Sequence, residues 1–150
     1  MNAHFENGNE YTIFNYNGHK LGGMVCLEST LPQLNRKFVK NGAELLFYVV
    51  NDGWYENPPQ PQQHARQTVF RAIEFRRPIL RCANTGISQI IDASGNIQHQ
   101  TQLNKAEVIR ASVVPNSKLT FYAKFGDIFA WLNIIIIIVS LFRGNLKKYE

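Results

Sequence analysis

The sequence predicts a layered α/β domain over residues 1–122, followed over residues 123–150 by one membrane-crossing helix and a basic tail. Three observations support this prediction. Apolar runs of strand length alternate with helical segments, which is typical of helices packed on a mostly parallel sheet. A hairpin of two short strands lies near the end of the domain. Beyond the domain, residues 128–142 form a stretch of fifteen residues without a formal charge.

The first half of the domain is expected to contain strands at 11–14 and 20–26, a helix at 31–41 and a strand at 44–50. An Asn17-Gly18 step separates the first two strands and is typical of a tight hairpin turn. Leu34 and Phe38 are four residues apart in the helix, and Gly42 is placed to cap its C-terminus. The segment ELLFYVV is almost unbroken in its apolar character, which indicates a strand covered on both faces.

The second half is expected to contain a loop at 57–61, a helix at 62–76 and strands at 79–82, 87–91, 97–101 and 108–114. Three prolines define the loop. Ala65, Val69 and Ile73 form one apolar stripe on the helix. Pro78 ends it, because a residue before proline disfavours the α conformation. The segment ASGN at 93–96 joins two of the strands as a hairpin turn.

The stretch 128–142 is interpreted as a transmembrane helix, although at 1.5 Å per residue it spans only about 22 Å against ~30 Å of hydrocarbon. A buried soluble helix or a strand is the competing interpretation. Aromatic residues precede or begin the stretch and basic residues follow it, as at a membrane interface. These residues are Phe121, Tyr122, Phe125, Phe129 and Trp131, then Arg143, Lys147 and Lys148.

Composition excludes several classes of protein. The chain has 150 residues, of which 45% are hydrophobic and 18% charged, so one folded domain with a real core is expected. The net charge is +5, but the basic residues form no run interleaved with aromatics, so nucleic acid is not an expected partner. Cys26 and Cys82 form no Cys-x-x-Cys pair, and the histidines have no metal-ligand spacing. We therefore expect neither a metal nor a cofactor.

Five segments carry a family resemblance. In chain order they are GMVCLES at 23–29, NDGWY at 51–55, QH at 63–64, RAIEFRRPILR at 71–81 and NTGIS at 84–88. Their joint order resembles the carbon–nitrogen hydrolase (nitrilase) superfamily and is most similar to apolipoprotein N-acyltransferases. The resemblance implies part of a nitrilase-type α-β-β-α sandwich.

The resemblance also implies a two-stage acyl transfer. Cys26 would be the nucleophile, taking a fatty acyl group from a phospholipid as a thioester. It would then pass this group to the α-amine of a lipoprotein's N-terminal diacylglyceryl-cysteine. A thiol suits this chemistry because it is nucleophilic and its thioester is labile, but it needs a base or a positive neighbour. Glu28 matches a further acid of the family, with an assisting role.

The chain departs from the family pattern in two places. Leu27 stands where the family usually has Tyr. The family's catalytic Glu and Lys lie upstream of the nucleophile, and Glu6, Glu10 and Lys20 match neither motif. We therefore expect a C-terminal portion that is inactive alone, with the missing half supplied by a preceding segment or a separate chain. The expected location is the inner membrane, with the domain on its exported face.

Alternatives remain open at the sequence level. The chain could be a nitrilase-like amidase or a membrane-tethered remnant without catalysis. Trp54 and Tyr55 could form a pocket wall or anchor a turn, and Glu74 and Arg77 could be site residues or a buried ion pair. Without the motifs, Cys26 would be a small core residue, as Cys82 is expected to be; His64 is expected to be a structural hydrogen-bonding residue.

Overall fold

A six-stranded mixed sheet forms the centre of the fold in the computed structural model, which describes residues 8–55 and 59–146. The strands lie side by side in chain order: β1 (Ile13–Tyr16), β2 (His19–Val25), β3 (Leu45–Val50), β4 (Ile79–Ala83), β5 (Gln89–Ile91) and β6 (Ile97–Gln100). Strands β2, β3 and β4 are parallel to one another. The pairs β1–β2, β4–β5 and β5–β6 are antiparallel. The predicted α/β class is therefore confirmed.

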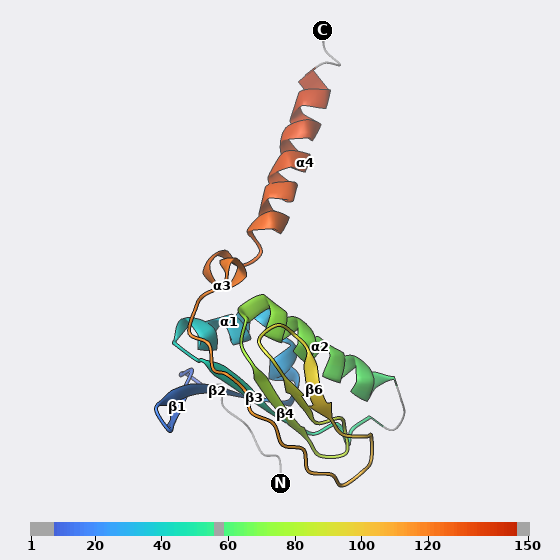
Figure 1. The fold of residues 1–150 in the computed structure, drawn as a ribbon. Coiled ribbons are helices and arrows are strands. Elements are labelled where there is room, and N and C mark those ends of the chain that lie inside the picture. Colours follow the sequence, from blue (N-terminus) through green and yellow to red (C-terminus); the bar gives the residue numbers. More distant parts are fainter. Residues whose placement is uncertain (1–7, 56–58, 147–150) are drawn as a thin grey trace.

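The helices are η1 (Cys26–Thr30), α1 (Pro32–Lys40), α2 (Gln60–Phe75), α3 (Phe121–Phe125) and α4 (Ile128–Leu146). Helices α1 and α2 lie together on one side of the sheet (Figure 1). The core lies between them and alternate strand residues. Met24, Leu46, Tyr48, Phe75 and Ile79 are all less than 2% exposed there. Burial of large apolar side chains of this kind is the main stabilising contribution to the domain.

Local sequence signals explain where several elements begin and end. Asn17 and Gly18 both have positive φ, 48° and 80°, as a two-residue hairpin turn requires. Gly42 has φ 98° and its N–H donates to the carbonyl of Val39, which closes the C-terminus of α1. Arg76 ends α2 in a left-handed conformation, two residues before Pro78. These predicted turns and caps are confirmed.

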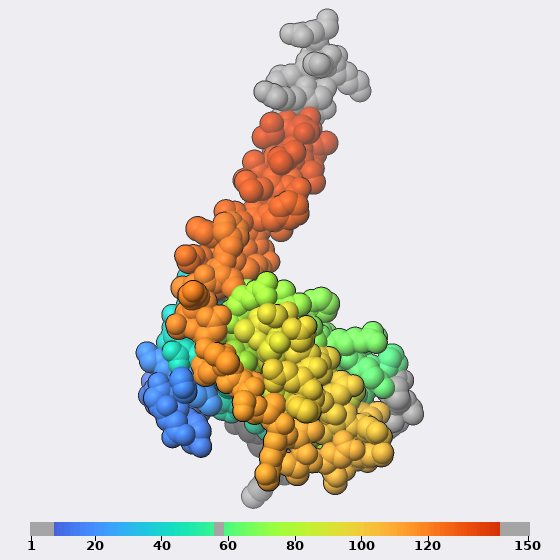
Figure 2. Space-filling model, viewed as in Figure 1, coloured from blue at the N-terminus to red at the C-terminus, as the bar shows by residue number. Residues whose placement is uncertain are grey.

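The strand predicted at 108–114 is not formed, so that prediction is wrong. Residues 105–120 have no regular secondary structure, and Val108 and Val114 are 85% and 83% exposed. The segment runs as a ridge along the domain toward α3 (Figure 2). Tertiary contacts decide this path: the Asn116 N–H donates to the carbonyl of Glu44, and the Asn116 side-chain amide donates to that of Arg76.

The predicted transmembrane helix is also corrected. Residues 128–146 do form a helix, α4, which extends away from the sheet (Figure 1). However, no helix among residues 8–55 and 59–146 is long and apolar enough to cross a membrane. The physical reason is the shortness of the apolar stretch, which Asn133 and Ser140 interrupt and which ends at Arg143. Lys147 and Lys148 of the predicted basic tail lie outside the described residues.

The second face of the sheet is apolar and largely uncovered. Phe14, Val25 and Val49 are 51%, 64% and 54% exposed, and Cys82 is also exposed. Phe47 lies over Gly23, where a Cβ would fall 2.4 Å from the ring. We call this surface the open face, defined by Phe14, Val25, Phe47, Val49, Leu80 and Cys82. Cys82, expected in the core, is therefore at the surface.

Candidate nucleophile site

Cys26 lies where the parallel strands end. It directly follows β2, and its Sγ is 3.7 Å from the carbonyl oxygen of Asn51, which directly follows the parallel strand β3. Its φ is 50°, a left-handed conformation that is uncommon for a residue with a side chain. Such conformations cluster at functional sites because the surrounding structure must hold them. The carboxyl edge of parallel strands is also where α/β folds place ligands.

Two side chains of η1 brace the backbone at Cys26. The Glu28 carboxylate accepts a hydrogen bond from the Val25 N–H at 2.8 Å. The Ser29 hydroxyl donates to the carbonyl of Cys26 at 2.6 Å. Glu28, predicted to assist catalysis, therefore contacts the backbone before the nucleophile. Both bonds stabilise the turn that presents the thiol.

A buried polar cluster lies under α2 beside this turn. It consists of Ser29, Asp52, His64 and Arg81, each 4% exposed or less. Asp52 accepts from Arg81 Nη2 at 2.8 Å and lies 2.8 Å from His64 Nδ1. Burial lowers the pKa of the Arg81 guanidinium, and the charges of Asp52, then of Cys26 and Tyr55, oppose that shift. The cluster therefore pairs the positive charge of Arg81 with the carboxylate of Asp52 inside the protein.

Gly86 leaves the room that this cluster needs. A Cβ at Gly86 would lie 2.0 Å from Asp52 Oδ2, well inside van der Waals contact. The Gly of the NTGIS segment is therefore required by the carboxylate of the NDGWY segment. Sequence reasoning identified both segments as family motifs but missed Asp52, Ser29 and Arg81 as a set. Their presence within the quoted motifs is the signal that could have found them.

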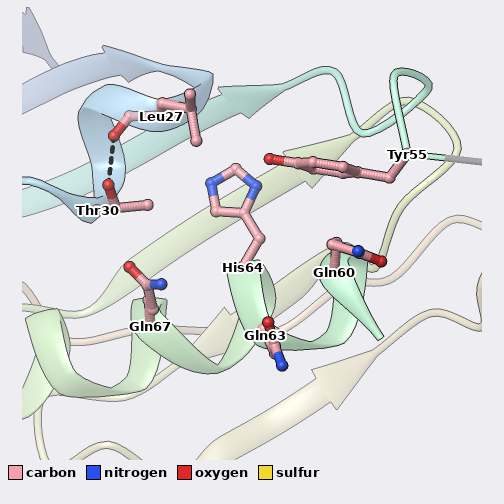
Figure 3. Close-up of a pocket in the computed structure, with 7 residues that line it drawn as sticks. All are labelled: Leu27, Thr30, Tyr55, Gln60, Gln63, His64 and Gln67. Atoms are coloured by element: carbon pink, nitrogen blue, oxygen red, sulfur yellow. Dashed lines mark hydrogen bonds between the residues drawn. The ribbon is translucent and has the colours of Figure 1, made fainter. Parts of the chain in front are cut away.

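A shallow polar pocket lies next to the nucleophile turn (Figure 3). It is lined by Leu27, Thr30, Tyr55, Gln60, Gln63, His64 and Gln67. Tyr55 thus contributes to a pocket wall, while Trp54 is 81% exposed. The three glutamines project from one helix, and their amides can both donate and accept hydrogen bonds.

Glu74 and Arg77 do not meet at the nucleophile or with each other. Glu74 pairs with Arg71 at 2.6 Å within α2, and burial raises the pKa of its carboxyl group. Arg77 is fully buried and donates to backbone carbonyls that include those of Ala43 and Lys118. Ala43 precedes β3, whereas Cys26 lies beyond the other end of the neighbouring strand. The contacts of Arg77 are therefore structural.

Among the described residues, no group of three or more His, Cys, Asp or Glu side chains could hold a metal ion. The cluster around Asp52 instead pairs one carboxylate with one guanidinium and one imidazole. This pairing offsets the cost of removing charged side chains from water.

Comparison with known proteins decides the family. The family model described as carbon-nitrogen hydrolase matches residues 2–118. The chain belongs to the carbon–nitrogen hydrolase family. This carbon–nitrogen hydrolase chain is 42% identical over 112 residues to the apolipoprotein N-acyltransferase of Geobacter metallireducens. That alignment covers 75% of this chain and 22% of the relative.

A second relative matches almost the whole chain. The apolipoprotein N-acyltransferase of Thermotoga maritima is 36% identical over 146 residues, covering 97% of this chain and 29% of the relative. The resemblance carried by the sequence motifs is confirmed. The carbon–nitrogen hydrolase chain thus spans between about a fifth and a third of the length of these curated relatives.

A solved structure shows the same fold. The carbon-nitrogen hydrolase from Helicobacter pylori G27 superposes with a TM-score of 0.60 at 21% identity. It covers 69% of this chain, which in turn covers 43% of that protein. The nitrilase-type α/β fold is therefore confirmed for this chain. The described residues of the chain form a single sheet of that fold.

Proposed function

We propose that this chain is the nucleophile-bearing portion of an apolipoprotein N-acyltransferase, with Cys26 as the nucleophile. The observation that carries this proposal is the left-handed turn that holds the Cys26 thiol at the ends of the parallel strands. The relatives named apolipoprotein N-acyltransferase support the choice of reaction within the family. The substrates proposed are a phospholipid acyl donor and a lipoprotein bearing an N-terminal diacylglyceryl-cysteine.

The proposed reaction has two steps. The Cys26 thiolate attacks the carbonyl carbon of a fatty acyl ester, a C–S bond forms, and the ester C–O bond breaks. The lysophospholipid leaves as an alcohol after taking a proton. The α-amine of the acceptor then attacks the thioester carbonyl and gives up a proton to the general base, an amide forms, and the C–S bond breaks to regenerate the thiolate. A covalent intermediate of this kind divides one difficult transfer into two easier steps.

The contacts of Cys26 support a requirement for further residues. Within the described part of the chain, its thiol has one hydrogen-bonding contact, the carbonyl of Asn51. A carbonyl cannot remove the thiol proton, and Glu28 is engaged by the backbone of Val25. A general base and an oxyanion donor would be needed for acyl transfer. We propose that the rest of a nitrilase-type domain supplies both, and that this chain alone is inactive.

The open face supports this proposal, because it offers a surface for the rest of such a domain. Phe14 and Phe47 pack against each other there with ring centroids 5.8 Å apart, and Val25 and Val49 extend the apolar surface. An exposed apolar patch of this kind usually marks an interaction site. The partner could be a preceding segment of the same polypeptide or a separate chain.

We also propose that the assembled enzyme acts at the inner membrane, with this domain on the exported face. The proposed donor and acceptor are both lipids or lipid-bearing, so the thiol must lie near a bilayer surface. Phe121, Phe125, Phe129 and Trp131 are 54–78% exposed along α3 and the start of α4, and aromatic rings favour the interfacial region.

A chimera tests the proposal. The homologous region of the Thermotoga maritima relative is replaced by this chain, and the purified protein is incubated with phospholipid vesicles. We expect a hydroxylamine-sensitive acyl group on Cys26 by mass spectrometry, and its transfer to a diacylglyceryl-cysteine peptide. Cys26→Ala abolishes both signals, whereas the matched variant Cys82→Ala retains them. Acylation that survives Cys26→Ala would refute the role of Cys26.

Two further outcomes separate the alternatives. Hydrolysis of a small amide without transfer of an acyl group would favour an amidase. Thioester formation by the isolated chain would contradict the proposed need for the rest of the domain.

A further inference from the structure

A continuous series of hydrogen bonds connects the buried cluster to the backbone of Cys26. Arg81 Nη2 donates to Asp52 Oδ2 at 2.8 Å, and Asp52 Oδ1 lies 2.8 Å from His64 Nδ1. His64 Nε2 lies 3.2 Å from Ser29 Oγ, which donates to the Cys26 carbonyl at 2.6 Å. The series brings together β4, the loop after β3, α2 and η1. Each of the four side chains is almost fully buried, so their geometry is fixed.

The order Ser29, His64, Asp52 is that of a Ser-His-Asp catalytic triad. A second nucleophile is nevertheless excluded, because Ser29 is only 2% exposed and its hydroxyl points to a backbone carbonyl. No substrate carbonyl can reach that oxygen without unfolding η1. The cluster must therefore serve the neighbouring residue that is accessible, Cys26.

The turn at Cys26 needs such support. A left-handed backbone is unfavourable for a residue with a side chain and persists only when the surroundings hold it. The Glu28 brace lies at the exposed surface, where water competes for the carboxylate. The Ser29 brace is partly buried, and a hydrogen bond that is shielded from water is electrostatically stronger. Ser29 is in turn held by His64, and His64 is oriented by Asp52 and Arg81.

We propose that His64 is a positioning residue for the nucleophile: through Ser29 it fixes the left-handed turn that presents the Cys26 thiol. Asp52 and Arg81 orient the His64 ring. This inference rests on the proposed role of Cys26 as nucleophile. It assigns His64 no contact with substrate and no proton transfer to the thiol.

Two substitutions of His64 separate its contact with Asp52 from its contact with Ser29. The amide nitrogen of Asn corresponds to Nδ1, so His64→Asn keeps the Asp52 bond and loses Ser29. The amide of Gln reaches the place of Nε2, so His64→Gln loses the Asp52 bond and keeps Ser29. Because the Ser29 hydroxyl donates its proton to the Cys26 carbonyl, its oxygen can accept a hydrogen bond from the Gln amide.

Hydrogen exchange of backbone amides in the full chain measures the turn directly. We expect His64→Asn and Ser29→Ala to raise the exchange of residues 25–31 about fivefold, the equivalent of one net hydrogen bond. His64→Gln should restore exchange to within about twofold of the wild type, because the Ser29 contact remains. The exposed His99 offers a matched control, and His99→Gln should leave the turn unchanged.

The proposal is overturned if His64→Gln loosens the turn as much as His64→Asn does, since only His64→Gln keeps the contact with Ser29. It is also overturned if Ser29→Ala leaves the amide exchange of residues 25–31 at the wild-type rate. Because Ser29→Ala removes a single oxygen atom, it provides this test even if the His64 variants unfold. Exchange does not depend on acyl transfer. A failure of the chimera to acylate Cys26 would therefore contradict the proposed function without affecting this result.

Discussion

Gly86→Ala is the substitution whose effect the structure determines most sharply. The added Cβ would lie 2.0 Å from Oδ2 of Asp52 and 2.7 Å from its Cγ. The carboxylate is buried and held on both oxygens, by Arg81 and His64, so it cannot rotate away without breaking both contacts. Gly86 does not have a positive φ, so the backbone itself tolerates alanine and the clash alone decides the outcome.

The loss of stability expected for Gly86→Ala follows from the ion pair between Asp52 and Arg81 that it breaks. Separating Asp52 from Arg81 leaves an uncompensated buried charge, which costs about 3–5 kcal/mol. A domain of this size is stabilised by about 5–15 kcal/mol in total. With a urea m-value of about 2 kcal/mol per molar, a loss of about 3 kcal/mol lowers the unfolding midpoint by about 1.5 M.

Urea unfolding of the full chain, followed by circular dichroism, measures this shift. The matched control is Gly8→Ala, because a Cβ at Gly8 would meet nothing within 4 Å. Its free energy of unfolding should stay within about 0.5 kcal/mol of the wild type. If Gly86→Ala is as stable as Gly8→Ala, the tight packing of Asp52 against Gly86 is wrong.

Three other substitutions test separate parts of the fold. Arg76→Gly should raise the free energy of unfolding by about 1 kcal/mol, since Arg76 is left-handed at φ 50°; an unchanged urea midpoint would contradict this. The Asp92 carboxylate accepts hydrogen bonds from the backbone N–H groups of Ser94 and Asn96 and from the side-chain amide of Asn96. The bond from the Asn96 side chain is the largest of the causes that lower the pKa of Asp92. The stability advantage of the wild type over Asp92→Asn should therefore be full above pH 3.8 and disappear as pH falls through the lowered pKa; a constant difference in pH-dependent unfolding would refute it. Val49→Lys places a charge on the open face, so it should reduce association of the isolated chain, measured by light scattering. The same substitution should abolish acylation by the chimera. An active chimera would exclude the open face as the contact with the rest of the domain.

The sequence predicted the local elements well, because their signals are local. The Asn17-Gly18 turn, the Gly42 cap and the apolar strand, predicted at 44–50 and found at Leu45–Val50, all depend on residues next to one another in the chain. Two elements were predicted wrongly. Residues 108–114 are largely apolar, as a strand can be, but have no strand pairing, and α4 is helical but too short in its apolar part.

The sequence by itself determined the family and placed Cys26 at the end of a predicted strand, since motifs and hydrophobic patterns are written along the chain. Only the tertiary structure decided which polar side chains meet. Ser29, Asp52, His64 and Arg81 come from four separate segments, and their contact depends on how parallel strands align and where α2 crosses the sheet. Hydrophobic pattern fixes which face of an element is buried, but not which buried polar atoms lie opposite one another. For that reason the thiol could be predicted, and the buried hydrogen bonds that support it could not.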